Sequence, residues 1–183
     1  MVDSIELRCK VVVLAIALGV AACSSPPPPT QTASDGTFVV TVSVPSGTHH
    51  ASEALDVVAT LTYQGPAPSI AVDGDDVGLV HFTFKQLDGA RVGESVSDLM
   101  CAPQTTLLRG TAATFRPGNS IGWVDYDPNA SFDTQAPADP DVHLSAGRWQ
   151  IIATAQIWDS RTCYGASPDH TISTPPLVLD VVP

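Results

Sequence analysis

Alternation between apolar and other residues with a period of two most constrains the fold of this chain. The clearest example is residues 149–157, where tryptophan, isoleucine and alanine occupy every odd-numbered position. The segments 37–44, 55–63, 80–85 and 177–181 alternate in the same way. A period of two places successive side chains on opposite faces of a β-strand, and the helical period of 3.6 is nearly absent. The sequence therefore predicts an all-β protein.

Turn residues separate these segments. Asp88-Gly89 is the strongest short hairpin signal, with a return strand expected over residues 90–96. The proline- and glycine-rich segment 100–140 has room for two short strands, around Leu107 and Thr114. About seven or eight strands divided by turns predict an antiparallel β-sandwich of the immunoglobulin-like class.

The N-terminal apolar run, Val11 to Val20, is too short to cross a bilayer, which takes roughly 20 helical residues. Arg8 and Lys10 precede it, and the small residues Ala21 and Ala22 follow it. A positive start, a short apolar run and small residues are typical of a signal peptide.

The tetrapeptide Val20-Ala21-Ala22-Cys23 resembles the lipobox of bacterial lipoproteins. This resemblance implies that the Cys23 thiol carries a diacylglyceryl group and that Cys23 becomes the first residue of the mature chain. The protein is then held at the extracytoplasmic face of a cell membrane by lipid alone, because two acyl chains suffice for stable anchoring. The alternative is an ordinary secretory signal that leaves Cys23 as an incidental thiol.

Three regions follow from this interpretation. Residues 1–22 are the signal peptide, residues 23–36 are the lipidated cysteine and a proline-rich tether, and residues 37–183 are the β-sandwich domain. A domain of this length buries enough surface to fold unaided.

The chain is acidic, with a formal net charge of −11. The predicted signal peptide carries two basic and two acidic side chains, so its removal leaves this charge unchanged. Such a charge argues against nucleic acid as a partner and against electrostatic docking on anionic lipid, because both are repelled.

Two cysteines, Cys101 and Cys163, remain after removal of Cys9 and acylation of Cys23. We expect them to form one disulfide, since exported domains fold where disulfides form. Their spacing excludes a CxxC redox pair, and two isolated cysteines make a poor zinc site.

Residues 144–151 read LSAGRWQI and resemble the penultimate strand of bacterial immunoglobulin-like domains. The wider pattern, from residues 53–65 to the final segment 177–182, resembles uncharacterised bacterial lipoproteins and, more distantly, the sandwich of bacterial intracellular proteinase inhibitors. We expect Trp149 in the core. For Trp158 and Trp123 we weigh exposure at a binding surface against burial, and we favour burial.

Calcium is the one metal ion that the sequence suggests. The oxygens of Asp125, Asp127, Asn129 and Asp133 match the start of a calcium loop. Alanines stand where the turn glycine and the bidentate acid belong, so we favour a solvated acidic loop, with calcium as the alternative. The acidic turn at residues 73–76 is a weaker candidate, and the five histidines show no zinc or copper spacing.

No catalytic motif stands out, and we predict that the protein is not an enzyme. We expect a lipid-anchored binding or structural module of the cell envelope, with an envelope protein or polymer as partner. The alternative is a protease inhibitor that presents the segment from Cys101 to Gly110, held by the disulfide.

Overall fold

The computed structural model describes residues 27–95, 101–117, 121–125, 141–159 and 166–183. These residues form strands and no helix, so none of them provides a helix able to cross a membrane. The strands are β1 (Thr30–Ser34), β2 (Phe38–Ser43), β3 (Thr48–His50), β4 (Val58–Tyr63), β5 (Ser69–Val72), β6 (Val80–Gln86), β7 (Arg91–Ser95), β8 (Thr105–Leu108), β9 (Ala112–Phe115), β10 (Ile121–Asp125), β11 (Gly147–Ile157), β12 (His170–Ser173) and β13 (Leu177–Val182).

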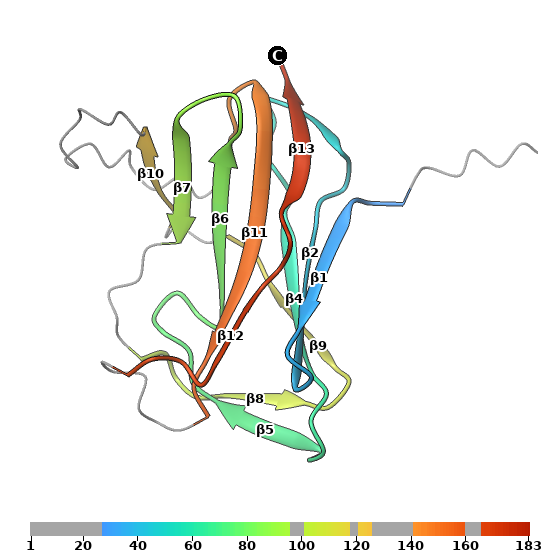
Figure 1. Ribbon diagram of the computed structural model, residues 1–183, viewed down its shortest axis with the longest axis vertical. Coiled ribbons are helices and arrows are strands. Elements are labelled where there is room, and N and C mark those ends of the chain that lie inside the picture. Colours follow the sequence, from blue (N-terminus) through green and yellow to red (C-terminus); the bar gives the residue numbers. More distant parts are fainter. Residues whose placement is uncertain (1–26, 96–100, 118–120, 126–140, 160–165) are drawn as a thin grey trace, which may run out of the picture.

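The strands form two large sheets and one small one. We call the four-stranded sheet, of order β1-β2-β4-β9, sheet A. Sheet B has the order β10-β7-β6-β11-β13-β3, and β12 also pairs with β11. Strands β5 and β8 form a separate two-stranded sheet across one end of the molecule (Figure 1).

Sheets A and B share one hydrophobic core. Strand β11 is the longest strand that lines this core. Its side chains Trp149, Ile151 and Ala153 point inward and are fully buried. Phe38 and Leu61 come from sheet A and belong to the same cluster of buried residues. The all-β, sandwich-like character predicted from the alternation is therefore confirmed.

The strands with regular alternation are found where they were predicted. Strands β2, β4, β6, β11 and β13 fall within or close to the expected segments. The hairpin predicted at Asp88-Gly89 joins β6 to β7, with Phe84 opposite Gly93. Leu107 and Thr114 lie in the short strands β8 and β9.

The structure also differs from the expected sheet in three ways. The described residues hold 13 strands rather than seven or eight, because short strands such as β3 and β12 carry too few residues to show alternation. Strand β3 pairs with β13 in parallel, so sheet B is mixed rather than purely antiparallel. Residues 30–34, which were placed in the tether, form β1 and pair along the whole of β2.

The two ends of the molecule carry different segments. At one end, which we call the Pro29 end, the carbonyl of Pro29 accepts a hydrogen bond from the Val44 amide, and the carbonyl of Gly47 accepts one from Asp180. At the other end, which we call the His170 end, the β1–β2 turn meets the start of β12 and the small sheet of β5 and β8 (Figure 1). Strand β1 runs from the first end to the second.

Candidate functional site

The predicted lipid attachment site, Cys23, lies outside the described residues. The described chain enters sheet A almost at once, since β1 begins at Thr30. The structure therefore gives the position of the chain from residue 27 onward, and the anchor itself stays a prediction.

The predicted disulfide has one end within the described residues. Cys101 is exposed and forms an isolated antiparallel bridge with Asp75, at the turn before β6. Cys163 lies outside the described residues, so its pairing with Cys101 stays a prediction.

The calcium candidates also fall largely outside the described residues. Asp125 is the last residue of β10, where its backbone pairs with Arg91. Asp127, Asn129 and Asp133 are not described. Within the described part of the chain, no three histidine, cysteine, aspartate or glutamate side chains come together as metal ligands.

All three tryptophans are buried, as predicted. Trp149 is fully buried, and its ring meets that of Trp123 edge to face at 6.1 Å between centroids. The guanidinium carbon of Arg91 lies 4.8 Å from the Trp123 ring centroid, which is a cation–π contact. Trp158 is buried and donates from Nε1 to the carbonyl of Ala166 at 3.0 Å, so it is not an exposed binding residue.

The acidic turn at residues 73–76 forms a buried cluster with a histidine. Asp75 accepts backbone hydrogen bonds from Val77 and Gly78, and its Oδ2 lies 3.1 Å from Nε2 of His81. Oδ2 of Asp73 and Nε2 of His81 are both buried without a well-aligned hydrogen-bond partner in the described structure. The sequence indicated only a turn here. It could not predict that Asp73 is buried, because the burial depends on backbone pairing of Asp73 with Trp158, which is far away in the sequence.

A second cluster joins the two large sheets at the His170 end. Nδ1 of His170 lies 2.6 Å from Oδ2 of Asp35, in the β1–β2 turn, and Nε2 lies 3.4 Å from Oδ2 of Asp159. The His170 ring also packs edge to face on Phe38. We call this group, Asp35, His170 and Asp159, the carboxylate–histidine clasp.

The clasp shifts the pKa of two of its members toward their charged forms. Burial alone would lower the pKa of His170, but its hydrogen bond to Asp35 and the charges of Asp159 and Asp35 outweigh burial and raise that pKa above 6.5. Burial would likewise raise the pKa of Asp35, but backbone hydrogen bonds from Phe38 and Thr37 and the His170 contact lower it below 3.8. The clasp is therefore an ion pair between the sheets at mildly acidic pH.

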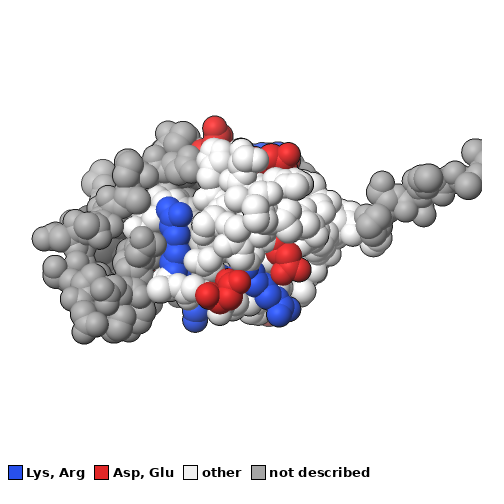
Figure 2. All heavy atoms as spheres, turned by 90° about the horizontal axis from the view of Figure 1, so that it is seen from above, with Lys and Arg blue, Asp and Glu red and all other residues white. Residues whose placement is uncertain are grey.

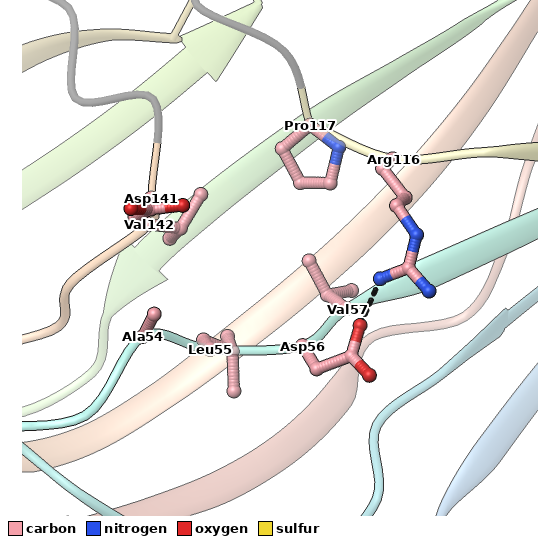
Figure 3. Close-up of a pocket in the computed structure, with 8 residues that line it drawn as sticks. All are labelled: Ala54, Leu55, Asp56, Val57, Arg116, Pro117, Asp141 and Val142. Atoms are coloured by element: carbon pink, nitrogen blue, oxygen red, sulfur yellow. Dashed lines mark hydrogen bonds and ion pairs between the residues drawn. The ribbon is translucent and has the colours of Figure 1, made fainter.

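A shallow hollow opens between the segment before β4, the residues just after β9 and the segment before β11 (Figure 3). Its volume is about 210 Å³, and Leu55, Val57 and Val142 supply its apolar lining. An ion pair between Arg116 and Asp56 stands at its rim. This volume is below the roughly 300–1,000 Å³ usual for small-molecule sites.

The segment suggested as an inhibitor loop, Cys101 to Gly110, is only partly a loop. Residues 105–108 form β8 and pair with β5, while Arg109 donates from its backbone to the Pro68 carbonyl. Leu108 stands out from this strand with 56% of its surface exposed. The segment is thus extended and fixed along one edge.

The fold and these clusters define a sandwich-like all-β protein with a clasp between its sheets and a shallow, partly apolar hollow. Comparisons with family models, curated proteins and solved structures find no match to this chain.

Proposed function

We propose that this protein is a lipid-anchored binding or structural module on the extracytoplasmic face of a bacterial cell envelope. The observation that carries the proposal is the lipobox-like Val20-Ala21-Ala22-Cys23 at the end of a short apolar run. The proposal includes no catalytic step, and its partner is an envelope protein or polymer.

The position of β1 supports an anchored arrangement. Only residues 24–29 separate Cys23 from β1, which begins at Thr30. Six extended residues reach at most about 20 Å, so a lipid on Cys23 would hold the Pro29 end close to the membrane surface. The tether is then shorter than the sequence alone suggested.

The charge distribution fits attachment by lipid rather than by a basic surface. Figure 2 views the molecule from above Figure 1, toward the end at which β13 finishes, and the described acidic and basic side chains are interspersed there. Arg148 and Asp180, for example, lie 4.0 Å apart at this end. Interspersed charges give little attraction to anionic lipid.

We also propose that the sandwich belongs to the immunoglobulin-like class. The support is strand order: β2, β4 and β9 are neighbours in sheet A, and β7, β6, β11 and β13 are neighbours in sheet B. Immunoglobulin-like sandwiches place strands A, B and E in one sheet and C′, C, F and G in the other, which is the same order. Strands β1, β3 and β10 would then be additions at the sheet edges.

The disulfide between Cys101 and Cys163 is part of this proposal. The support is the predicted export of the domain, since exported domains fold where disulfides form. The other cysteines, Cys9 and Cys23, belong to the predicted signal peptide and lipid anchor.

The hollow of Figure 3 is the surface that we assign to partner binding. Its apolar lining of Leu55, Val57 and Val142 is flanked by the charges of Arg116 and Asp56. An apolar centre with a polar rim is the usual arrangement of a protein interface.

Membrane sedimentation of a Cys23→Ser variant tests the anchor. The wild-type protein should sediment with membranes and the variant should remain in the soluble fraction. Cys9→Ser is the matched control, because it removes a cysteine from the same segment and should leave sedimentation unchanged. Sedimentation of the Cys23→Ser variant would refute the anchor.

The inhibitor alternative is tested with a panel of extracellular proteases. It is favoured by the exposed Leu108 on the extended, paired strand β8. An inhibitor would block at least one protease at an equimolar dose, and Leu108→Asp would abolish that inhibition. A binding module would inhibit none of them.

A further inference from the structure

The acidic turn at residues 73–76 lies where the small sheet meets sheet B. The pairing of β5 with β8 continues past the end of β5 to Asp75, which is opposite Cys101. Asp73 pairs with Trp158, just after β11, through two backbone hydrogen bonds of 2.9 and 3.1 Å. The chain is therefore extended from β5 to Asp75, so the side chains of Asp73 and Asp75, two positions apart, leave the same face of it.

Asp73 brings a buried carboxylate to this junction. Only 5% of its surface is exposed, and its Oδ2 has no hydrogen-bond partner in the described structure. A buried polar atom without a partner costs free energy, and the cost is greatest when the group is charged. A cation at this oxygen would remove the cost.

Asp75 and His81 lie at the spacing of two ligands on one metal ion. Oδ2 of Asp75 is 3.1 Å from Nε2 of His81, and the two side chains are only 7% and 13% exposed. The two atoms are close but not aligned as donor and acceptor, since Nε2 has no hydrogen-bond partner in the described structure. Two atoms bound to one zinc ion by bonds of about 2.0–2.1 Å are themselves about 2.9–3.4 Å apart. Close spacing without alignment therefore fits two ligand atoms directed at a shared ion.

We propose that Asp73, Asp75 and His81 bind a Zn²⁺ ion, with water as the fourth ligand. The described structure holds no three side chains that converge as they stand. Asp75 and His81 are thus the two ligands already in place, and Asp73 joins them by rotation about its Cα–Cβ bond. Carboxylate oxygen and imidazole nitrogen together suit Zn²⁺, whereas Ca²⁺ takes about six to eight oxygen ligands.

The bound ion would fix the small sheet to sheet B. Asp73 and Asp75 continue β5, while His81 is the second residue of β6. Asp75 also accepts backbone hydrogen bonds from Val77 and Gly78, so an ion on Asp75 would hold the whole turn between the two sheets. This role is structural, and it depends neither on the lipid anchor nor on the hollow.

Thermal unfolding of the full-length protein in detergent, with and without Zn²⁺, tests the site. With Zn²⁺ at a hundredfold excess over its dissociation constant, the melting temperature should rise by about 5 °C or more. His81→Gln and, independently, Asp73→Asn should each remove this rise, because each deletes one ligand. His50→Gln is the matched control: it removes a histidine whose ring meets the Pro183 carbonyl, away from this turn, and should leave the rise unchanged.

Co²⁺ in place of Zn²⁺ reports on the ligands directly. Its visible absorption strengthens when protein ligands hold it in a four-coordinate site, and His81→Gln and Asp73→Asn should both lose this absorption. If either variant fails to fold, the other decides the test.

Three results would overturn the proposal. The first is a melting temperature that Zn²⁺ leaves unchanged. The second is an equal rise in the wild type and in His81→Gln, which would place the bound Zn²⁺ elsewhere on this acidic chain. The third is a rise with Ca²⁺ that Zn²⁺ does not produce, which would contradict a site with an imidazole ligand.

Discussion

At the scale of single residues, His170 connects the two large sheets through polar contacts. Its ring lies between Asp35, in the β1–β2 turn, and Asp159, just after β11, while it also packs on Phe38. The raised pKa of His170 means that its contribution to stability is complete below pH 6.5 and fades as the pH rises through the folded-state value. The lowered pKa of Asp35 means that its contribution is complete above pH 3.8 and fades on acidification.

The clasp therefore stabilises the fold most between pH 3.8 and 6.5. We predict that His170→Gln lowers the free energy of unfolding by about 0.5–1 kcal/mol at pH 5.5, a value typical of a partly exposed ion pair, and by less at pH 8.5. Urea denaturation at the two pH values measures the difference. His50→Gln is the control, since the His50 ring meets the Pro183 carbonyl. A loss for His170→Gln that is equal at both pH values would contradict the charge-based account.

Gly93 shows a different constraint, set by space rather than charge. A Cβ atom at this position would lie 2.5 Å from Cζ3 of Trp123. We predict that Gly93→Ala lowers the free energy of unfolding by about 1–3 kcal/mol, because the Trp123 ring is packed on both sides and must move. The exposed neighbour Glu94→Ala provides the control in the same urea experiment. Equal stability of the two variants would contradict this prediction, because it would show that the Trp123 ring can move without a cost in free energy.

The sequence predicted some of these residues and missed others for physical reasons. Trp149 follows the alternation of its strand and was assigned to the core correctly. The clasp was missed because Asp35 and His170 are 135 positions apart and only the packing of the two sheets brings them together. A glycine inside a strand, such as Gly93, is a sequence signal of close approach that could have been used.

At the scale of elements, strand β1 changes the boundary of the domain. The proline-rich residues before it suggested a tether up to residue 36, yet residues 30–34 pair with β2 throughout and Ala33 packs on the core. Four of the five residues are polar and the strand is short, so period-two alternation could not reveal it. The longer strands β2, β6, β11 and β13 could be predicted because each buries one face in the core.

Truncation tests the role of β1. We predict that a chain starting at Asp35, which keeps the carboxylate–histidine clasp, is less stable than one starting at Pro27 by on the order of 2 kcal/mol, because the edge of β2 and the inner side of Ala33 become exposed. The expected fall in melting temperature is about 4–8 °C. A chain starting at Pro29 keeps β1 and is the control. Equal melting temperatures for all three chains would show that β1 adds nothing to the sheet.

At the scale of the whole molecule, the proposed disulfide would link the segment before β8 to the segment after β11. Closing a loop of about 60 residues stabilises a fold by roughly 4 kcal/mol in the chain-entropy model. We predict that a thiol reductant lowers the free energy of unfolding of the wild-type protein by about this amount.

The double variant Cys101→Ser, Cys163→Ser controls for other effects of the reductant. It should be less stable than the wild type from the outset and should not respond to the reductant. A wild-type protein whose urea midpoint is the same with and without reductant would contradict the disulfide.

The orientation of the domain relative to the predicted lipid anchor also belongs to the scale of the whole molecule. The sheets, the hollow and the clasp lie on a molecule whose first strand starts at Thr30, seven positions after Cys23. With a lipid on Cys23, the Pro29 end faces the membrane, while the His170 end, with the clasp and the small β5–β8 sheet, points away from it. Lipidation of Cys23 is thus the claim on which orientation, location and function all depend.

Mass spectrometry of the intact protein extracted from the membranes of its own cells tests this claim most directly. We expect a mature chain that lacks residues 1–22 and carries a diacylglyceryl group on Cys23. A chain that retains residues 1–22, or one that begins at an unmodified Cys23, would contradict it.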